Sequence, residues 1–182
     1  GMLYFFTNRY KEAIPYFLIV TKMVEDEVVP MGYHTATFSN LADCYAHLGK
    51  YEEAEKIYLE MCEIDLATDG ESSDNYPVTI SRLGDLYLFQ GRLEEAKKTH
   101  LKAIALAEKY IEPQYIDFFY ILEQAYLFFE KTKDWEQVRM IGLKCFENNC
   151  MDELPASGTL VNIKMLAEKQ TFATMPYALK AL

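Results

Sequence analysis

The sequence repeats itself at an interval of about 42 residues, and this repeat restricts the fold more than any other feature. Residues 40–54 and 82–96 share leucine, aspartate, tyrosine, glycine, a Glu-Glu pair and alanine at the same offset. The small residues that extend the interval in both directions are Ala13, Ala54, Ala96 and Val138, at steps of 41, 42 and 42 residues. A fixed period of this length is typical of stacked helical repeats, in which each unit buries its apolar face against its neighbours.

Each repeat has the pattern of two helices joined by a short turn. Apolar residues recur at steps of three and four from Phe38 to Leu48, as on one face of a helix. Gly49 ends this helix, since glycine tolerates the positive φ that often closes a helix, and a second helix begins near Tyr51. The expected first helices cover residues 33–48, 76–90 and 114–131, and their partners cover residues 51–66, 92–109 and 134–148.

These segments predict an all-α fold, a right-handed superhelical solenoid of antiparallel helix pairs, in a single domain over residues 1–182. The expected parts are an incomplete first repeat at 1–28, a second at 33–68, a third at 75–110, an irregular fourth at 113–149, and a C-terminal capping helix and tail at 155–182. Only Leu3 to Thr7 remain of the first helix of the first repeat, so we expect the chain to be an excised piece of a longer protein.

The repeated alanines predict where the helices cross most closely. Ala54 and Ala96 begin the second helices of their repeats, and a larger residue there would force two helices apart. We therefore expect both alanines to be buried, with Tyr45 and Tyr87 packed beside them.

The fourth repeat departs from the pattern of the others. Its first helix matches the earlier ones at Phe119, Leu122 and Tyr126 only if about three residues are inserted before Trp135. Gly142 also stands where an aromatic residue is expected. The sequence therefore predicts an irregular pairing between the third and fourth repeats.

The repeat resembles the tetratricopeptide repeat, whose signature places aromatic residues, Leu-Gly, tyrosine and alanine at fixed steps. The matching residues are Phe38, Leu41, Ala42, Tyr45, Ala54 and Tyr58 in the second repeat, and Ile80, Leu83, Gly84, Tyr87 and Ala96 in the third, where His100 replaces the late aromatic residue. The longer period, the segment 49–55 and the acidic loop between repeats resemble the kinesin-light-chain-type subclass. The resemblance covers about residues 2–148 and implies a concave groove, lined by the first helices, that holds a protein or peptide.

Composition narrows the classes of partner. The net charge of −10, from 28 acidic and 18 basic residues, argues against nucleic acid and anionic membranes and is compatible with a basic protein or peptide. The same charge also suits a protein that is merely kept soluble. No apolar run is long enough to span a bilayer. The four cysteines form no C-x-x-C motif, and those in helical patterns suit a reduced, cytoplasmic protein.

The sequence offers little for catalysis, so we expect no enzymatic activity and no cofactor. It contains no G-x-S-x-G, H-E-x-x-H or glycine-rich phosphate loop. Cys44 and His47 are three residues apart on a helix, but two ligands without a clear third make a poor metal site. We therefore expect no metal.

The candidate binding residues lie on the expected first helices, away from the apolar face. They are Ser39, Asn40, Asp43 and His47 in the second repeat, and Ser81, Arg82, Asp85 and Phe89 in the third. The resemblance implies that an amide such as that of Asn40 bonds a peptide backbone, since it offers a donor and an acceptor. The repeat brings Asp43 and Asp85 together, which favours a basic peptide. Alternatively, Arg82 and the two aspartates form an internal ion-pair lattice that only stiffens the solenoid.

Chaperone-binding members of the family hold a terminal carboxylate with lysine and asparagine at the places of Ser39 and Asp43. This chain has neither residue, and an aspartate would repel the ligand, so we expect no such role. The leading interpretation is a protein- or peptide-binding scaffold. The alternative is a ligand-sensing regulatory segment of a larger signalling protein or transcription regulator. Leu3, Tyr4, Phe5 and Phe6 are expected to lack partners in the short first repeat, which predicts self-association through the N-terminal end.

Overall fold

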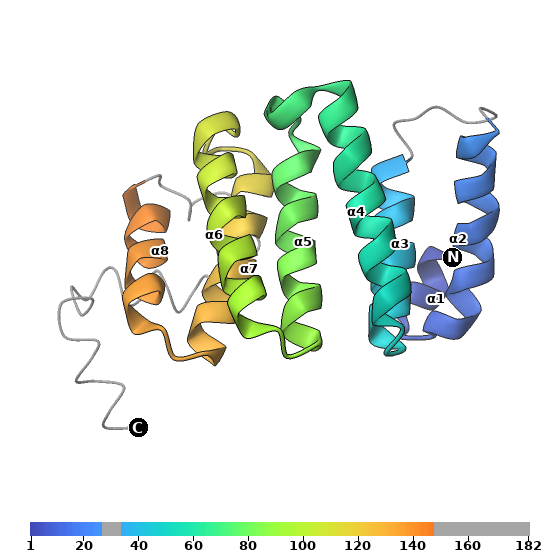
Figure 1. The fold of residues 1–182 in the computed structure, drawn as a ribbon, viewed down its shortest axis with the longest axis horizontal. Helices are drawn as coiled ribbons and strands as arrows, with labels where there is room; N and C mark the ends of the chain where they lie inside the picture. The colour runs from blue at the N-terminus through green and yellow to red at the C-terminus, as the bar shows by residue number, and fades with distance from the viewer. Residues whose placement is uncertain (27–33, 148–182) are drawn as a thin grey trace. The chain divides into compact units, whose positions relative to one another are not determined.

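The computed structural model describes residues 1–26 and 34–147, and every regular element in these two ranges is a helix (Figure 1). In chain order the elements are α1 (Met2–Phe6), α2 (Tyr10–Glu25), α3 (His34–His47), α4 (Tyr51–Thr68), the 3-10 turn η2 (Gly70–Ser72), α5 (Asn75–Phe89), α6 (Leu93–Tyr110), α7 (Ile116–Lys131) and α8 (Trp135–Glu147). The six predicted helices of the second to fourth repeats are confirmed to within two residues at each end. The predicted capping helix at 155–182 lies outside the described residues.

The helices form two compact units, Gly1–Ala96 and Lys97–Leu182. The first unit contains α1 to α5 and the first turn of α6, and the second contains the rest of α6 with α7 and α8. Among the helices of the described residues, none is both long and apolar enough to cross a membrane. The fold class, all-α and built from tetratricopeptide-like helix pairs, is confirmed; a single domain over residues 1–182 stays a prediction.

The same turn joins two successive helices in each repeat. Its central residue has a positive φ, and these residues are Asn8 (58°), Gly49 (75°), Gly91 (75°) and Lys133 (61°). The backbone amides that follow them, in Arg9, Lys50, Arg92 and Asp134, donate at 2.8–2.9 Å to the carbonyls of Tyr4, Tyr45, Tyr87 and Phe129, five residues earlier. This closure satisfies a carbonyl that the end of the helix leaves open, and glycine adopts the required φ without steric cost.

The turn corrects the predicted register of the fourth repeat. Because the amide of Asp134 bonds the carbonyl of Phe129, it is Phe129 that takes the place of Tyr87, at the regular spacing of 42 residues. The predicted insertion before Trp135 was therefore wrong. Tyr126, which suggested it, stands where Gly84 stands in the third repeat and is buried at 3% exposure. A buried tyrosine three residues before the true equivalent gave a false match in the aromatic pattern.

The first unit has a continuous apolar core in which the repeated alanines are central. Ala54 is fully buried in a cluster with Phe38, Met61, Leu83 and others, while Tyr45 and Tyr87 pack at its edge. Ala96 is also fully buried. The predicted burial of both alanines is confirmed, and α3, α4 and α5 pack tightly because small residues let their backbones approach.

In the second unit, α7 packs against α8. The fully or almost fully buried side chains of these helices are Ile121, Leu122, Phe128, Phe129, Val138, Ile141 and Cys145. His100 of α6 is buried with its ring 4.9 Å from that of Phe128. Burial lowers the pKa of His100 to about 4, so the ring is neutral at neutral pH and serves as an aromatic core residue.

Candidate functional site

Six of the eight predicted binding residues form one surface, which we name the α3–α5 face. It consists of Asn40, Asp43 and His47 on α3, and Arg82, Asp85 and Phe89 on α5. The spacing of three and four residues places each set along one side of its helix. Two contacts join the sets, an ion pair from Arg82 to Asp43 and a ring contact between His47 and Phe89.

The two serines do not belong to this face. Ser39 and Ser81 are 4% and 0% exposed, and the Oγ of Ser39 lies 4.0 Å from the Sδ of Met61 in the core. The expectation that they line a groove does not hold, because serine is small enough to be packed beneath its polar neighbours. Asn40 remains half-buried, and its amide Nδ2 lies 3.3 Å from the Sδ of Met2 in α1.

Asp43 is held by two donors from neighbouring helices. The Nη1 of Arg82 donates to its Oδ2 at 2.9 Å, and the hydroxyl of Tyr58 on α4 donates to its Oδ1. The side chains of Arg82 and Asp43 are 27% and 25% exposed, so this ion pair is only partly screened by water. For Asp43, the structure thus has the internal ion pair that the sequence left open as an alternative.

Asp85 lies beside this ion pair and shares its single cation. Burial of the carboxyl group and the charge of Asp43 raise the pKa of Asp85 to about 7, against the opposing effect of Arg82. Two carboxylates and one guanidinium therefore meet at the junction of two repeats. An additional positive charge at this place would favour the ionised form of Asp85.

A row of aromatic rings runs along the same end of the helices. The rings of Tyr10 and His47 are stacked, with centroids 4.4 Å apart and planes at 6°. The rings of His47 and Phe89 follow at 5.9 Å and 54°. His47 is exposed and Phe89 is 53% exposed, so the row faces solvent. Sequence reasoning found His47 and Phe89 but missed Tyr10, which comes from α2 and joins the row only through the packing of α2 on α3.

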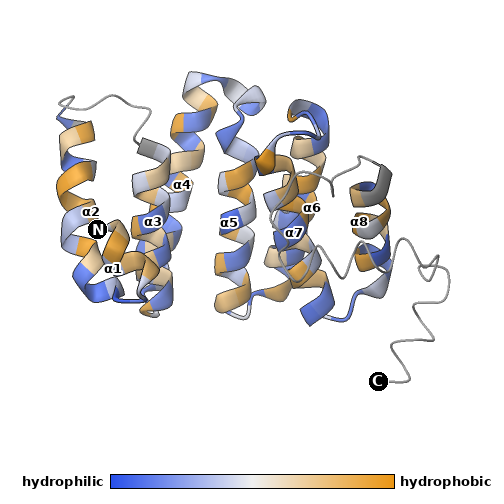
Figure 2. Cartoon of the chain, turned by 180° about the vertical axis from the view of Figure 1, so that it is seen from behind, coloured by the Kyte–Doolittle hydropathy of each residue, from blue (hydrophilic) through white to orange (hydrophobic). Residues whose placement is uncertain are grey.

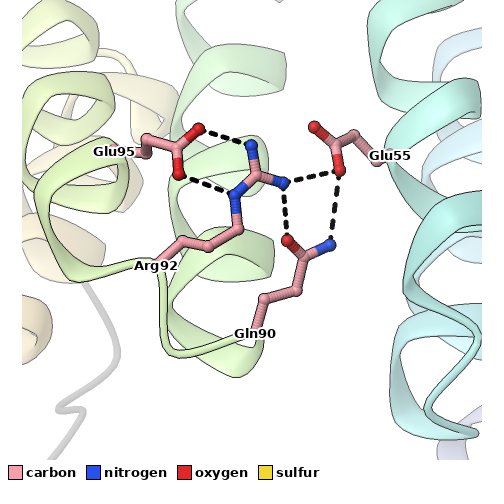
Figure 3. Close-up of polar contacts among 4 residues, drawn as sticks. All are labelled: Glu55, Gln90, Arg92 and Glu95. Carbon is pink, nitrogen blue, oxygen red and sulfur yellow. Dashed lines mark hydrogen bonds and ion pairs between the residues drawn. The ribbon is translucent and has the colours of Figure 1, made fainter.

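A second polar cluster links the same repeats on their second helices (Figure 3). The Nη1 of Arg92 donates to the Oε2 of Glu55 at 2.8 Å and to the Oε1 of Gln90 at 2.6 Å, while its Nε donates to the Oε2 of Glu95 at 2.7 Å. Arg92 lowers the pKa of Glu95, so the carboxylate stays ionised. With these donors engaged, the Arg92 cluster is best understood as a connection between repeats.

Sequence reasoning missed this connection, although a signal for it exists. In the second unit the Nζ of Lys97 lies 2.7 Å from the Oδ2 of Asp134. Lys97 and Asp134 stand 42 residues after Glu55 and Arg92, so the repeat keeps an ion pair at this place and exchanges its charges. Opposite charges 37 residues apart in successive repeats could have identified both pairs.

The predicted residues do not assemble a metal centre. Within residues 1–26 and 34–147, no group of three or more histidine, cysteine, aspartate or glutamate side chains is placed to hold a metal ion. Cys44, the better of the two residues considered, is buried, and burial with the nearby charge of Asp43 raises the pKa of its thiol to about 11. A thiol in this environment is protonated, whereas metal binding needs the thiolate.

Comparison with known proteins agrees with this architecture. Two crystal structures of nearly identical TPR-like repeats, from a Podosopora anserina protein assigned as a kinesin light chain, are each 12% identical with a TM-score of 0.67; they cover 99% and 97% of this chain and 89% and 84% of their own. The structure of BtubC (BKLC) from P. vanneervenii is 14% identical with a TM-score of 0.57, over 79% of this chain and 60% of its own. No curated protein sequence matches.

At these identities the solved structures show a shared fold and nothing more. The sequence itself matches the tetratricopeptide repeat over residues 33–109, the region of α3 to α6 that includes the α3–α5 face. That match confirms the resemblance seen in the 42-residue pattern. Residues 33–109 therefore belong to the tetratricopeptide-repeat family, and the described residues have the fold of kinesin-light-chain-like repeats.

Proposed function

We propose that this chain is a non-enzymatic scaffold that binds a protein or peptide through the α3–α5 face. The observation that carries the proposal is the repetition of one motif on adjacent helices: a carboxylate followed one turn later by an exposed ring, as Asp43 with His47 and Asp85 with Phe89. The paired motifs offer both charge and apolar contact to a ligand that lies across two repeats. The tetratricopeptide fold supports a role in protein interaction.

The charge of the face favours a basic ligand. Asp43 and Asp85 carry two potential negative charges near Arg82, and the whole chain carries a net charge of −10. An acidic peptide would bring like charges together, which costs free energy in a partly buried site. Nothing in the described residues specifically favours the regulatory alternative. Cys44, Cys62 and Cys145 are free thiols in the core, which supports a reducing compartment such as the cytoplasm.

The basic-ligand proposal predicts that Asp85→Asn weakens binding of a basic peptide about three- to tenfold, as expected when one charge-assisted contact is lost. The measurement is the Kd of a lysine- and arginine-containing peptide by fluorescence anisotropy, with an acidic peptide of equal length as the comparison. The affinity for the basic peptide is also expected to fall as salt rises.

Glu63→Gln provides a matched control, because it removes one negative charge from an exposed position of α4 outside the face. It should leave the Kd nearly unchanged. Asp43→Asn answers a separate question, since its carboxylate bonds Arg82 and Tyr58 and its loss is expected to lower stability. Equal binding of the two peptides, or of Asp85→Asn and the parent chain, would refute the proposed basic ligand.

The N-terminal end supports a second proposal, self-association. Leu3 and Phe6 of α1 are 76% and 72% exposed, and Tyr16 and Ile19 of α2 are 49% and 59% exposed. Tyr4 and Phe5 are half-buried against the first repeat, so the prediction of four side chains short of partners applies most strongly to Leu3 and Phe6. Figure 2 shows the hydrophobic bands of α1 and α2. Apolar surface of this kind tends to be covered.

We expect Phe6→Asp to reduce self-association of the chain, because a charge in the apolar surface would have to be desolvated. Sedimentation velocity over a range of concentrations measures the effect. Tyr115→Asp is the control, since Tyr115 is a 58% exposed ring before α7 and outside this surface. If the parent chain sediments as a monomer at every concentration, self-association is excluded.

A further inference from the structure

We infer that the aromatic row seats an arginine side chain of the bound peptide, with its guanidinium flat against Phe89 and His47 and paired with Asp85. The face would then select arginine over lysine. This inference rests on the proposed function and specifies the chemistry of the ligand. It comes from an arrangement that the chain repeats within its own structure.

The chain uses one device at the turns of its first three repeats. A cationic residue follows the positive-φ residue, lies over the ring five residues earlier, and pairs with a glutamate three residues later. Arg92 has its Cζ 4.1 Å from the centre of the Tyr87 ring and binds Glu95 at 2.7 Å through Nε. Arg9 has its Cζ 4.6 Å from the Tyr4 ring, with its Nε 2.9 Å from Glu12.

The remaining example shows what lysine does at the same place. The Nζ of Lys50 is 5.6 Å from the centre of the Tyr45 ring and 3.8 Å from the Oε1 of Glu53. Both separations are longer than those of the arginines. A planar guanidinium can stack on a ring and direct two donors at a carboxylate, whereas an ammonium is a compact, strongly hydrated charge. Ring and carboxylate together therefore suit arginine better than lysine.

The α3–α5 face offers the ring and the carboxylate of this device without the arginine between them. Phe89 is four residues after Asp85 on α5, and neighbours at this spacing lie on the same side of a helix. The ring of Phe89 is 53% exposed, and His47 extends the aromatic surface at 5.9 Å. Arg82, the cation of this face, is directed to Asp43 by an ion pair of 2.9 Å. A guanidinium from a ligand would complete the arrangement.

Charge and shape agree on this ligand. Asp43 and Asp85 share Arg82, and the raised pKa of Asp85 indicates that a further positive charge would be accommodated there. An apolar side chain could use the rings but would leave the carboxyl group desolvated. A carboxylate side chain would be repelled. Arginine uses both groups at once.

The test compares three peptides of one Gly-Ser sequence that carry arginine, lysine or neutral citrulline at the same two positions, with the full chain and isothermal calorimetry. We expect the arginine peptide to bind about fivefold or more tightly than the lysine peptide, and citrulline to bind weakest. Phe89→Leu should remove most of the preference for arginine while both cationic peptides still bind. Because Phe89 is mostly exposed, this variant should keep the melting temperature of the parent chain.

Tyr115→Leu is the matched control, since it removes an exposed ring elsewhere and should leave all three affinities unchanged. Equal affinities for arginine and lysine, or a preference that survives Phe89→Leu, would overturn the inference and leave the proposed basic ligand intact. If neither cationic peptide binds better than citrulline, the proposed basic ligand fails, and the inference fails with it.

Discussion

Replacing Ala54 with leucine is expected to lower the free energy of unfolding by about 1–3 kcal/mol, the usual cost of forcing a larger side chain into a packed core. Ala54 is 0% exposed and lies in the cluster that joins α3, α4 and α5. Three added carbon atoms have no space there, so neighbouring helices must move apart. Urea denaturation, with the slope compared between the two proteins, measures the change.

Ala67→Leu provides the control for this prediction. Ala67 lies near the end of the same helix but is exposed, so the same substitution should change stability by no more than about 0.5 kcal/mol. Helix propensity differs little between alanine and leucine and cannot account for the contrast. A free energy of unfolding that is equal in Ala54→Leu and Ala67→Leu would show that Ala54 is not at a close helix crossing.

Asp85→Asn is expected to raise stability at pH 8 but not at pH 4. The pKa of Asp85 is raised from 3.8 to about 7, so between these values the folded chain keeps a proton that the unfolded chain has lost. Stability therefore falls as pH rises through this window, and the loss is complete above about pH 7. The pKa change sets a ceiling of about 4 kcal/mol, and since Asp85 is only half-buried we expect a gain of about 1–3 kcal/mol.

The difference between variant and parent isolates Asp85 from other titrating groups. Burial lowers the pKa of His100 to about 4, so its contribution is present above the unfolded pKa and is lost as pH falls, which is the opposite sign. This contribution is common to both proteins and cancels. Asp74→Asn, at the exposed N-cap of α5, should give a pH profile parallel to that of the parent. A difference for Asp85→Asn that is constant from pH 4 to pH 8 would contradict the prediction.

The repeat predicted the helices well because their formation depends on local order. Apolar residues at steps of three and four, and Gly49 and Gly91 at the turns, place the helix ends to within two residues. The fourth repeat was misaligned because Lys133 and not glycine occupies its turn, and because Tyr126 resembles the equivalent residue, Phe129. Backbone hydrogen bonds, rather than side-chain types, establish the correct register there.

The binding surface was predicted only in part. Offsets of 42 residues correctly brought Asp43 and Asp85 together, because equivalent residues of stacked repeats are neighbours. The same reasoning placed Ser39 and Ser81 on the surface, although both are buried. Neighbouring residues on a helix differ by about 100° in direction, and a small hydroxyl side chain can be accepted on either side of a boundary. The sequence pattern alone does not determine on which side it lies.

The sequence by itself determined the helices, the turns and which residues stand at equivalent places, because these depend on contacts within about five positions along the chain. Only the tertiary structure decided that Arg82 bonds Asp43, that Arg92 bonds Glu55, and that Tyr10 stacks on His47. These partners are 37 to 39 residues apart and belong to different helices. Whether two such side chains meet depends on the rotation and spacing of packed helices, which the whole core sets and no single segment encodes.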